Sequence, residues 1–510
     1  MNGDSTEEVV RVFEIAAQWR QTFGTDVVID VIGYRRHGHN EIDQPLFTQP
    51  LMYAHIAKHP TPLNVYKQHL IGSGALAQAE VDEICAVQQA HIEAAFEAAN
   101  DYNTPPNSWM ADNPEWAEAG INEVPQVRGG ESAEGYGHGV APDVLSQMME
   151  KLIEVPEGFK VHRGIERVLK QREQSFAEGA GIDWSSAEAL AVGSLLLEGN
   201  RVRLSGQDVQ RGTFSHRHAM VHDQSAKRSH VFVNHLAPDQ EHLFQVCNSP
   251  LSEFGVLGFE LGYSMESPKS LVMWEAQFGD FANGAQIIFD NFLCSMEAKW
   301  MRQSGLVCLL PHGYQGAGPE HSSCRIERFL QSSDEDPNDV PLSNETRREM
   351  ASRCNWQVAN PSTPANYFHL LRRQQNRGCV RIRACVCVLS KRTNNTPSHS
   401  SFFLSFFLLS FSYRKPLIVA STKALLRLPA SFSETDDLTT GTRFHRVFLE
   451  RFPEEINTQE DVKRIVMCSG KIYYELLEFR QKNDIKDVAI VSIEQILPFP
   501  FDRTADAVKE

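Results

Sequence analysis

Apolar residues near the start of the chain recur at the spacing of one helix face. Ser5 precedes this stretch, and Glu8 lies three residues after Ser5. This capping-box pattern predicts a helix through Arg20. The apolar positions of this helix are Val9, Val12, Phe13, Ile15, Ala16 and Trp19. The β-branched run at residues 26–34 predicts a buried strand of a parallel sheet. A polar loop, residues 35–50, follows at the end of the strand where α/β domains place functional groups.

The rest of the chain divides by the same patterns into a helical region and two further α/β units. Residues 51–180 read mostly as helical connections, and strands alternate with helices from Asp183 onward. Expected strands are residues 201–204, 271–274, 306–311, 416–420, 464–469 and 487–493, and expected helices are residues 186–198, 256–263, 367–377 and 471–482. This alternation predicts an α/β protein with parallel sheets flanked by helices.

One segment, residues 378–413, departs from this alternation. It begins rich in Cys, Val and Arg and ends in a Phe/Ser/Leu tract at residues 401–413. Codons for Phe, Ser and Leu are rich in pyrimidines, so the tract is what a splice acceptor would encode, and we predict an intron-derived insertion. The alternative is a genuine apolar helix, which at about 13 residues is too short to span a bilayer and would expose an apolar patch to water.

Length and composition narrow the class of protein. The chain has 510 residues, of which 42% are hydrophobic and 22% charged, as expected for a globular protein of about two to four domains. Its net charge of −16 argues against nucleic acid as a partner, because phosphate binding requires a basic face. The 10 cysteines show neither zinc-ribbon spacing nor a disulfide framework. The polar start, residues 1–4, is not a targeting segment, so either the protein is cytosolic or its true N-terminus precedes Met1.

The strongest candidate for chemistry is Glu253, which begins an expected apolar helix. A carboxylate at this position is often only a favourable partner for the helix dipole. Within an apolar pocket it can instead hold and share a proton, because burial favours the neutral form. The stretch Trp274–Phe281, with its aromatic and polar residues, follows a predicted strand and is a second candidate.

Several motifs resemble the thiamine-diphosphate-dependent decarboxylating component of 2-oxoglutarate and 2-oxoadipate dehydrogenase complexes. The motifs that carry the resemblance are residues 34–41, 48–53, 205–218, 248–253, 274–281, 310–323, 361–369, 414–420 and 468–474. The resemblance covers nearly the whole chain except residues 378–413. It implies a transketolase-like thiamine-diphosphate-binding fold that is truncated at both ends. The expected domains are residues 1–60 (end of the diphosphate-binding domain), 61–182 (helical linker), 183–377 (pyrimidine-binding domain), 378–413 (insertion) and 414–510 (incomplete C-terminal domain).

The resemblance also implies roles for individual residues. Glu253 matches the family glutamate that hydrogen-bonds the aminopyrimidine ring, and Phe278, next to Gln277, matches the aromatic residue that stacks on it. His321 and His39 match histidines that face the thiazolium ring and the substrate. His39 alone could equally be a surface residue, and Phe278 a core residue. The sequence His216-Arg217-His218 either binds a substrate carboxylate or solvates a loop.

The implied function is oxidative decarboxylation of 2-oxoglutarate or 2-oxoadipate and transfer of the acyl group to a lipoyl group. This reaction belongs to the tricarboxylic acid cycle or to lysine degradation. The partner is a lipoyl-bearing transacylase, and a homodimer in the mitochondrial matrix, without membrane or nucleic-acid contacts, is expected. The family's magnesium ligands, a Gly-Asp and a later Asn, are expected upstream of Met1, so no metal ligand is predicted in this chain. Two alternatives therefore remain: an inactive fragment, or a transketolase-type enzyme without a lipoyl partner.

Overall fold

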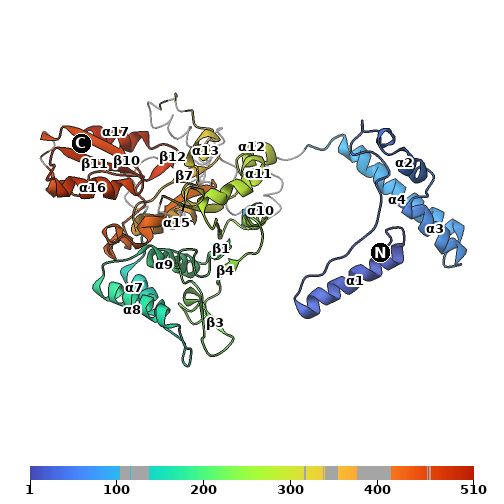
Figure 1. The fold of residues 1–510 in the computed structure, drawn as a ribbon. Coiled ribbons are helices and arrows are strands. Elements are labelled where there is room, and N and C mark those ends of the chain that lie inside the picture. Colours follow the sequence, from blue (N-terminus) through green and yellow to red (C-terminus); the bar gives the residue numbers. More distant parts are fainter. Residues whose placement is uncertain are drawn as a thin grey trace, which may run out of the picture. The chain divides into compact units, whose positions relative to one another are not determined.

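The computed structural model describes residues 1–103, 115–116, 137–314, 318–336, 338, 340, 354–375, 415–456, 458 and 461–509. The chain forms two compact units, Met1–Pro106 and Asn107–Glu510 (Figure 1). The predicted insertion, residues 378–413, lies outside the described residues. In the part of the chain that is described, the helices are too short or too polar to cross a membrane.

The first unit is helical in its regular structure. Its helices are α1 (Thr6–Phe23), α2 (Pro50–Ile56), α3 (Pro62–Gly72) and α4 (Gln78–Ala99), with a short turn η1 (Pro45–Phe47). Helix α1 confirms the predicted helix and ends at Gly24, whose left-handed conformation (φ 61°) suits a residue without a side chain. The predicted capping box is wrong, because the Ser5 side chain makes no cap hydrogen bond.

The predicted buried strand at residues 26–34 is also wrong for this unit. The segment makes one isolated bridge, between Asn2 and Ile32, and the Val28 side chain is 93% exposed. A strand needs a neighbouring strand to satisfy its backbone hydrogen bonds. Within the described residues of this unit no strand lies alongside the segment, so its β-branched residues stay in contact with solvent.

The second unit is organised around a seven-stranded sheet. The strands are β1 (Arg201–Gly206), β4 (Phe244–Asn248), β5 (Ser270–Glu275), β6 (Val307–His312), β7 (Gln357–Ala359), β8 (Leu417–Thr422) and β12 (Gln495–Leu497). Their order is β12-β7-β8-β6-β5-β1-β4, and all pairs are parallel except β12 with β7. A two-stranded hairpin, β2 (Val221–His222) and β3 (Ser229–His230), lies outside this sheet.

The large sheet is buried on both faces. Alternate residues of β5, Leu271 and Met273, contribute to one core, whereas Val272 and Trp274 contribute to the other. The first core contains residues of α7 (Pro142–Lys151), α8 (Arg163–Glu178), α9 (Trp184–Leu197) and α15 (Pro364–Gln375). The second contains residues of α10 (Glu253–Ser264), the segment α11-η4 (Gln286–Leu293), α12 (Met296–Trp300) and α13 (Ile326–Gln331). This arrangement is a three-layer α/β fold with parallel strands inside, as predicted (Figure 1).

A smaller sheet lies near the C-terminus. Its order is β10-β11-β9, built from β9 (Val447–Phe448), β10 (Arg464–Cys468) and β11 (Val488–Ile493), and it is flanked by α16 (Ile472–Lys482) and α17 (Phe501–Lys509). Tyr473 and Leu477 of α16 belong to the first core of the large sheet, so the two sheets share apolar contacts. The third unit was expected to begin near residue 414, but β8 is an interior strand of the large sheet, so the large sheet continues beyond that position.

Candidate active site

The carboxyl ends of neighbouring parallel strands of the large sheet carry the candidate functional residues. The segments that follow these ends carry Gln207 after β1, Glu253 after β4, Phe278 after β5, His321 after β6 and Lys423 after β8. Open α/β sheets bind their ligands at this edge, because the loops that leave adjacent strands meet there. The structure therefore brings the predicted residues Glu253, Gln277, Phe278 and His321 to one edge of one sheet.

Glu253 is the first residue of α10 and is half-buried. Its Oε1 accepts a hydrogen bond from the Gln207 side chain at 3.2 Å. A Cβ atom at Gly284 would lie only 3.4 Å from its Oε2, so a larger residue there would narrow the space beside the carboxylate. The carboxylate thus sits at a helix N-terminus, where the dipole favours negative charge.

Phe278 and His321 form an aromatic wall. Their ring centroids lie 4.3 Å apart, and Phe214 and Phe281 pack edge-on against Phe278 at 5.6 and 5.7 Å. Gly279 allows the close approach behind this wall, because a Cβ there would lie 2.6 Å from the carbonyl oxygen of Pro311. The close approach of Gly279, which follows β5, to Pro311 of β6 therefore holds the Phe278 ring in its position.

Lys423 is a buried cation next to this wall. Its ammonium donates a hydrogen bond to the backbone carbonyl of His321 and lies 5.6 Å from the centroid of the Phe278 ring. Burial lowers the pKa of Lys423, and the nearby charge of Asp280 partly opposes that effect. Asp280 is itself buried and accepts a hydrogen bond from the backbone N–H of Ser323 at 3.1 Å. Sequence reasoning missed both Lys423 and Gln207, although both follow strands that the apolar pattern predicted.

His312, at the end of β6, has a structural contact. Its Nδ1 accepts a hydrogen bond from the backbone N–H of Cys324 at 3.1 Å. Burial lowers the pKa of His312, and the charge of Lys423 lowers it further. This imidazole therefore helps to hold the loop that carries His321.

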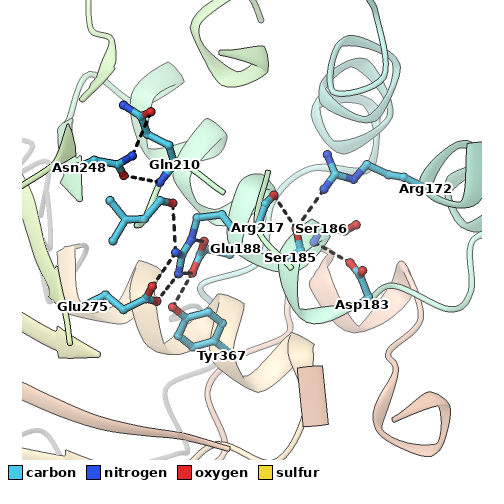
Figure 2. A network of polar contacts seen from close by, with 11 residues as sticks. Arg172, Asp183, Ser185, Ser186, Glu188, Gln210, Arg217, Asn248, Glu275 and Tyr367 are labelled. Atoms are coloured by element: carbon cyan, nitrogen blue, oxygen red, sulfur yellow. Dashed lines mark hydrogen bonds and ion pairs between the residues drawn. The ribbon is translucent and has the colours of Figure 1, made fainter. Parts of the chain in front are cut away.

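Arg217 lies in a buried ion network (Figure 2). Its guanidinium donates to Glu188 at 2.5 Å and to Glu275 Oε1 at 2.8 Å, and Tyr367 donates to Glu188 at 2.8 Å. The Arg217 residue is only 5% exposed. The Arg217 donors therefore face protein carboxylates in this structure. With two carboxylates and one guanidinium, the network carries one formal negative charge.

The histidines on either side of Arg217 differ in their surroundings. His216 lines a cavity whose other walls include Trp184, Phe214, Tyr367 and Lys423. Burial, followed by the charge of Arg217, lowers the pKa of His216 to about 3. Among the described atoms its Nδ1 is buried with no hydrogen-bond partner. His218 adopts a left-handed conformation (φ 47°), and its ring nitrogen contacts the Ser215 carbonyl at 3.0 Å.

His39 belongs to the first unit, whereas the other candidates belong to the second. Its side chain is exposed, its backbone N–H donates to Asp43 at 2.8 Å, and its Nδ1 lies 3.4 Å from Arg35. No group of three or more His, Cys, Asp or Glu residues in the described parts of the chain could hold a metal ion.

Three family models match the chain in order. Residues 1–108 match a dehydrogenase E1 component, residues 180–396 match the transketolase pyrimidine-binding domain, and residues 432–510 match the 2-oxoglutarate dehydrogenase C-terminal region. The "2-oxoglutarate dehydrogenase, mitochondrial" of Dictyostelium discoideum is 45% identical over 100% of this chain and 46% of its own length. The protein of that name from Schizosaccharomyces pombe is 41% identical (100% and 47%), and the E1 component of Brucella anthropi is 42% identical (98% and 45%). The chain thus spans about half the length of the curated relatives it matches.

Proposed function

The chain belongs to the 2-oxoglutarate dehydrogenase E1 family, and from this premise we propose that it takes part in oxidative decarboxylation of a 2-oxo dicarboxylic acid. The acyl group would pass to a lipoyl group on a partner transacylase. The observation that carries the proposal is the convergence of Glu253, Phe278 and His321 at the carboxyl edge of the large sheet. By the family resemblance, Glu253 and Phe278 match the residues that contact the pyrimidine ring, and His321 matches a histidine that faces the thiazolium ring and the substrate.

The described residues fit the pyrimidine part of thiamine diphosphate. Glu253 offers a carboxylate acceptor with one oxygen bonded to Gln207, and Gly284 leaves space beside the other oxygen. Phe278 offers a flat aromatic face on which a heteroaromatic ring can stack. Magnesium and the diphosphate are part of the proposal through the family alone, since the described residues contain no cluster of metal ligands.

We propose a separate role for each of these residues. When bound, thiamine diphosphate supplies the nucleophile and the electron sink for decarboxylation. Glu253 would hold a proton between its carboxylate and a ring nitrogen, and Phe278 would exclude water from that face. His321 would donate a hydrogen bond to the oxygen that becomes negatively charged. His39 is proposed to face the substrate through the family resemblance alone. His216 and His218 are proposed for substrate binding, whereas Arg217 is proposed to stabilise the fold through Glu188 and Glu275.

We propose the mitochondrial matrix as the location, since the Dictyostelium discoideum and Schizosaccharomyces pombe relatives are named mitochondrial. A lipoyl-bearing transacylase as the partner and a homodimer as the assembly are proposed from the family resemblance alone. Glutarate and adipate skeletons differ by one methylene, which a pocket discriminates by only about 1–3 kcal/mol. Both acids are therefore candidate substrates.

The test is release of carbon dioxide with magnesium, thiamine diphosphate and an artificial electron acceptor. It uses 2-oxoglutarate and 2-oxoadipate in parallel, for this chain and for the chain joined to the N-terminal part of a relative. Glu253→Gln should lower the rate at least about 100-fold, the usual size of a positioned acid–base group. Glu478→Gln, a change at an exposed carboxylate paired with Lys482, is the control and should keep the rate.

Two outcomes would point elsewhere. A rate that is unaffected by Glu253→Gln would contradict the proposed role. A sugar transketolase would act on ketose phosphates and reduce no lipoyl group, so a lipoyl-domain acceptor assay separates that alternative. Absence of turnover in both forms of the chain would favour the inactive fragment.

A further inference from the structure

Lys423 follows β8 directly, at the edge of the sheet where Glu253, Phe278 and His321 gather. A lysine is rarely buried without a partner, because its charge loses contact with water. Here only 9% of the residue is exposed, and the ammonium donates a hydrogen bond to the His321 carbonyl. A buried ammonium at this edge therefore requires a reason beyond packing.

The contacts of Lys423 link two strands to the aromatic wall. Its hydrogen bond reaches the short turn Pro319–His321, which follows β6, and the ammonium also lies 5.6 Å from the Phe278 ring. A donor aimed at a backbone carbonyl fixes the position of that residue's Cα and so the direction of its side chain. We propose that Lys423 is a positioning residue that holds the His321 imidazole against Phe278. This inference rests on the proposed function of the site.

Other charges around this turn have to be considered, since they also act on the imidazole. Glu320 Oε1 lies 3.5 Å from His321 Nδ1 on the same turn. Further charged or titratable groups come from η3 (Gly279–Ala285), β6, the loop before α13 and α13 itself: Asp280, His312, Arg325 and Glu327. On the cavity side, Lys423 shares its surroundings with Glu188, His216, Arg217 and Glu275. Among the groups around the turn, removing Lys423 leaves Arg325 as the remaining cation, so protonation of His312 becomes easier.

The test measures the histidines directly and needs no turnover. Histidine Cε1–H signals of the folded chain are titrated by NMR, with His321→Gln and His312→Gln identifying the two signals. In Lys423→Met the titration midpoint of His312 should rise, because the Lys423 charge that helps to lower its pKa is lost. The ring-current shift that Phe278 imposes on His321 should also decrease.

Two further variants separate positioning from general damage. Lys423→Arg keeps the charge and the donor and should restore both signatures. Lys415→Met removes a buried lysine at the opposite end of β8, where it pairs with Glu297, and should leave both histidines unchanged. If Lys423→Met does not fold, Lys423→Gln is used in its place, and the same rise in the titration midpoint of His312 is expected.

An unchanged His312 midpoint and an unchanged ring-current shift in a folded Lys423→Met or Lys423→Gln protein would overturn the inference, as would an equal change in Lys415→Met. Because these signals are read in the absence of cofactor, the inference and the proposed function fail independently. Normal turnover with unchanged histidine signals refutes only the positioning role, and altered signals without turnover refute only the function.

Discussion

The ring centroids of Phe278 and His321 lie 4.3 Å apart, and the two ring planes are inclined by 44°. The two residues follow different strands, β5 and β6, which pair in parallel through Trp274 opposite Cys308 and Glu275 opposite Leu309. Strand register therefore determines which side chains meet at this edge, because a shift by one residue would turn alternate side chains to the other face.

Replacing Phe278 by Ala is expected to weaken thiamine diphosphate binding by about tenfold. The reason is loss of ring stacking, which contributes about 0.5–1.5 kcal/mol beyond the buried area. Tryptophan fluorescence titration or calorimetry measures the affinity. Phe479→Ala, a change at a 61% exposed residue of α16, is the matched control and should bind normally. Equal affinities for both variants would exclude Phe278 from the cofactor site.

Replacing Arg217 by Met is expected to destabilise the protein by about 3–5 kcal/mol. The variant would leave Glu188 and Glu275 buried without their cation, and an uncompensated buried charge is costly. The free energy of unfolding from urea titration measures the effect.

Arg211→Met is the control for this prediction. Arg211 pairs with Asp208, but its side chain is 51% exposed, so its loss should change stability by less than about 1 kcal/mol. A small effect of Arg217→Met together with a large rise in the KM of the 2-oxo acid would instead assign Arg217 to the substrate.

Acid should destabilise the second unit through His369. Burial lowers the pKa of His369 to about 4, whereas an unfolded histidine titrates near pH 6.5. Between these values the unfolded state binds the additional proton, so stability is present above about pH 6.5 and is lost as the pH falls toward about 4. The full effect is on the order of 3 kcal/mol.

His369→Gln removes this titration and can still donate to the Asp437 carbonyl, which His369 Nε2 contacts at 2.8 Å. Urea unfolding at pH 7 and pH 4.5 should show a smaller acid loss in this variant than in the unmodified chain. His222→Gln, at an exposed histidine, should leave the acid loss unchanged. An identical pH dependence in all three proteins would contradict the prediction.

The apolar pattern predicted the central strands because their environment is uniform. Strands β5, β6 and β8 are buried on both faces and therefore appear as continuous apolar runs. Strand β4 escaped detection because it is an edge strand, in which the exposed Gln245 and Asn248 interrupt the apolar residues. Strand β7 has only three residues, too few to produce a periodic signal.

The contacts of the site residues were less predictable, because the residues that bury and bond them lie far apart in the sequence. The partners of Arg217 lie 29 and 58 positions away, so the motif His216-Arg217-His218 could not reveal that its arginine is enclosed by carboxylates. Lys423 follows a predicted strand, but its contact with His321 spans 102 positions. Glu253 and the stretch that contains Phe278 were candidates from the residues themselves, but their roles came from a family resemblance, and the assignment of those roles stays a prediction.

Removal of residues 378–413 is expected to leave the fold intact and to stabilise it by about 2 kcal/mol. The segment lies in the connection between α15 and β8, where the chain crosses from β7 to its parallel neighbour. The side-chain amide of Gln374 donates to the backbone carbonyl of Lys415 at 2.8 Å, so the two ends of the connection are already close. Joining Arg377 to Arg414 would leave a connection of five residues, Asn376, Arg377, Arg414, Lys415 and Pro416, a common length for such loops.

The expected gain comes from loop entropy, because the present connection of residues 376–416 is about eight times longer and each doubling costs about 0.6 kcal/mol. Urea unfolding of the deletion variant measures it. The control replaces residues 378–413 by a Gly/Ser sequence of the same length, which should unfold like the original chain. A deletion variant that is less stable than this control would show that the segment makes native contacts and would contradict its origin as an intron-derived insertion.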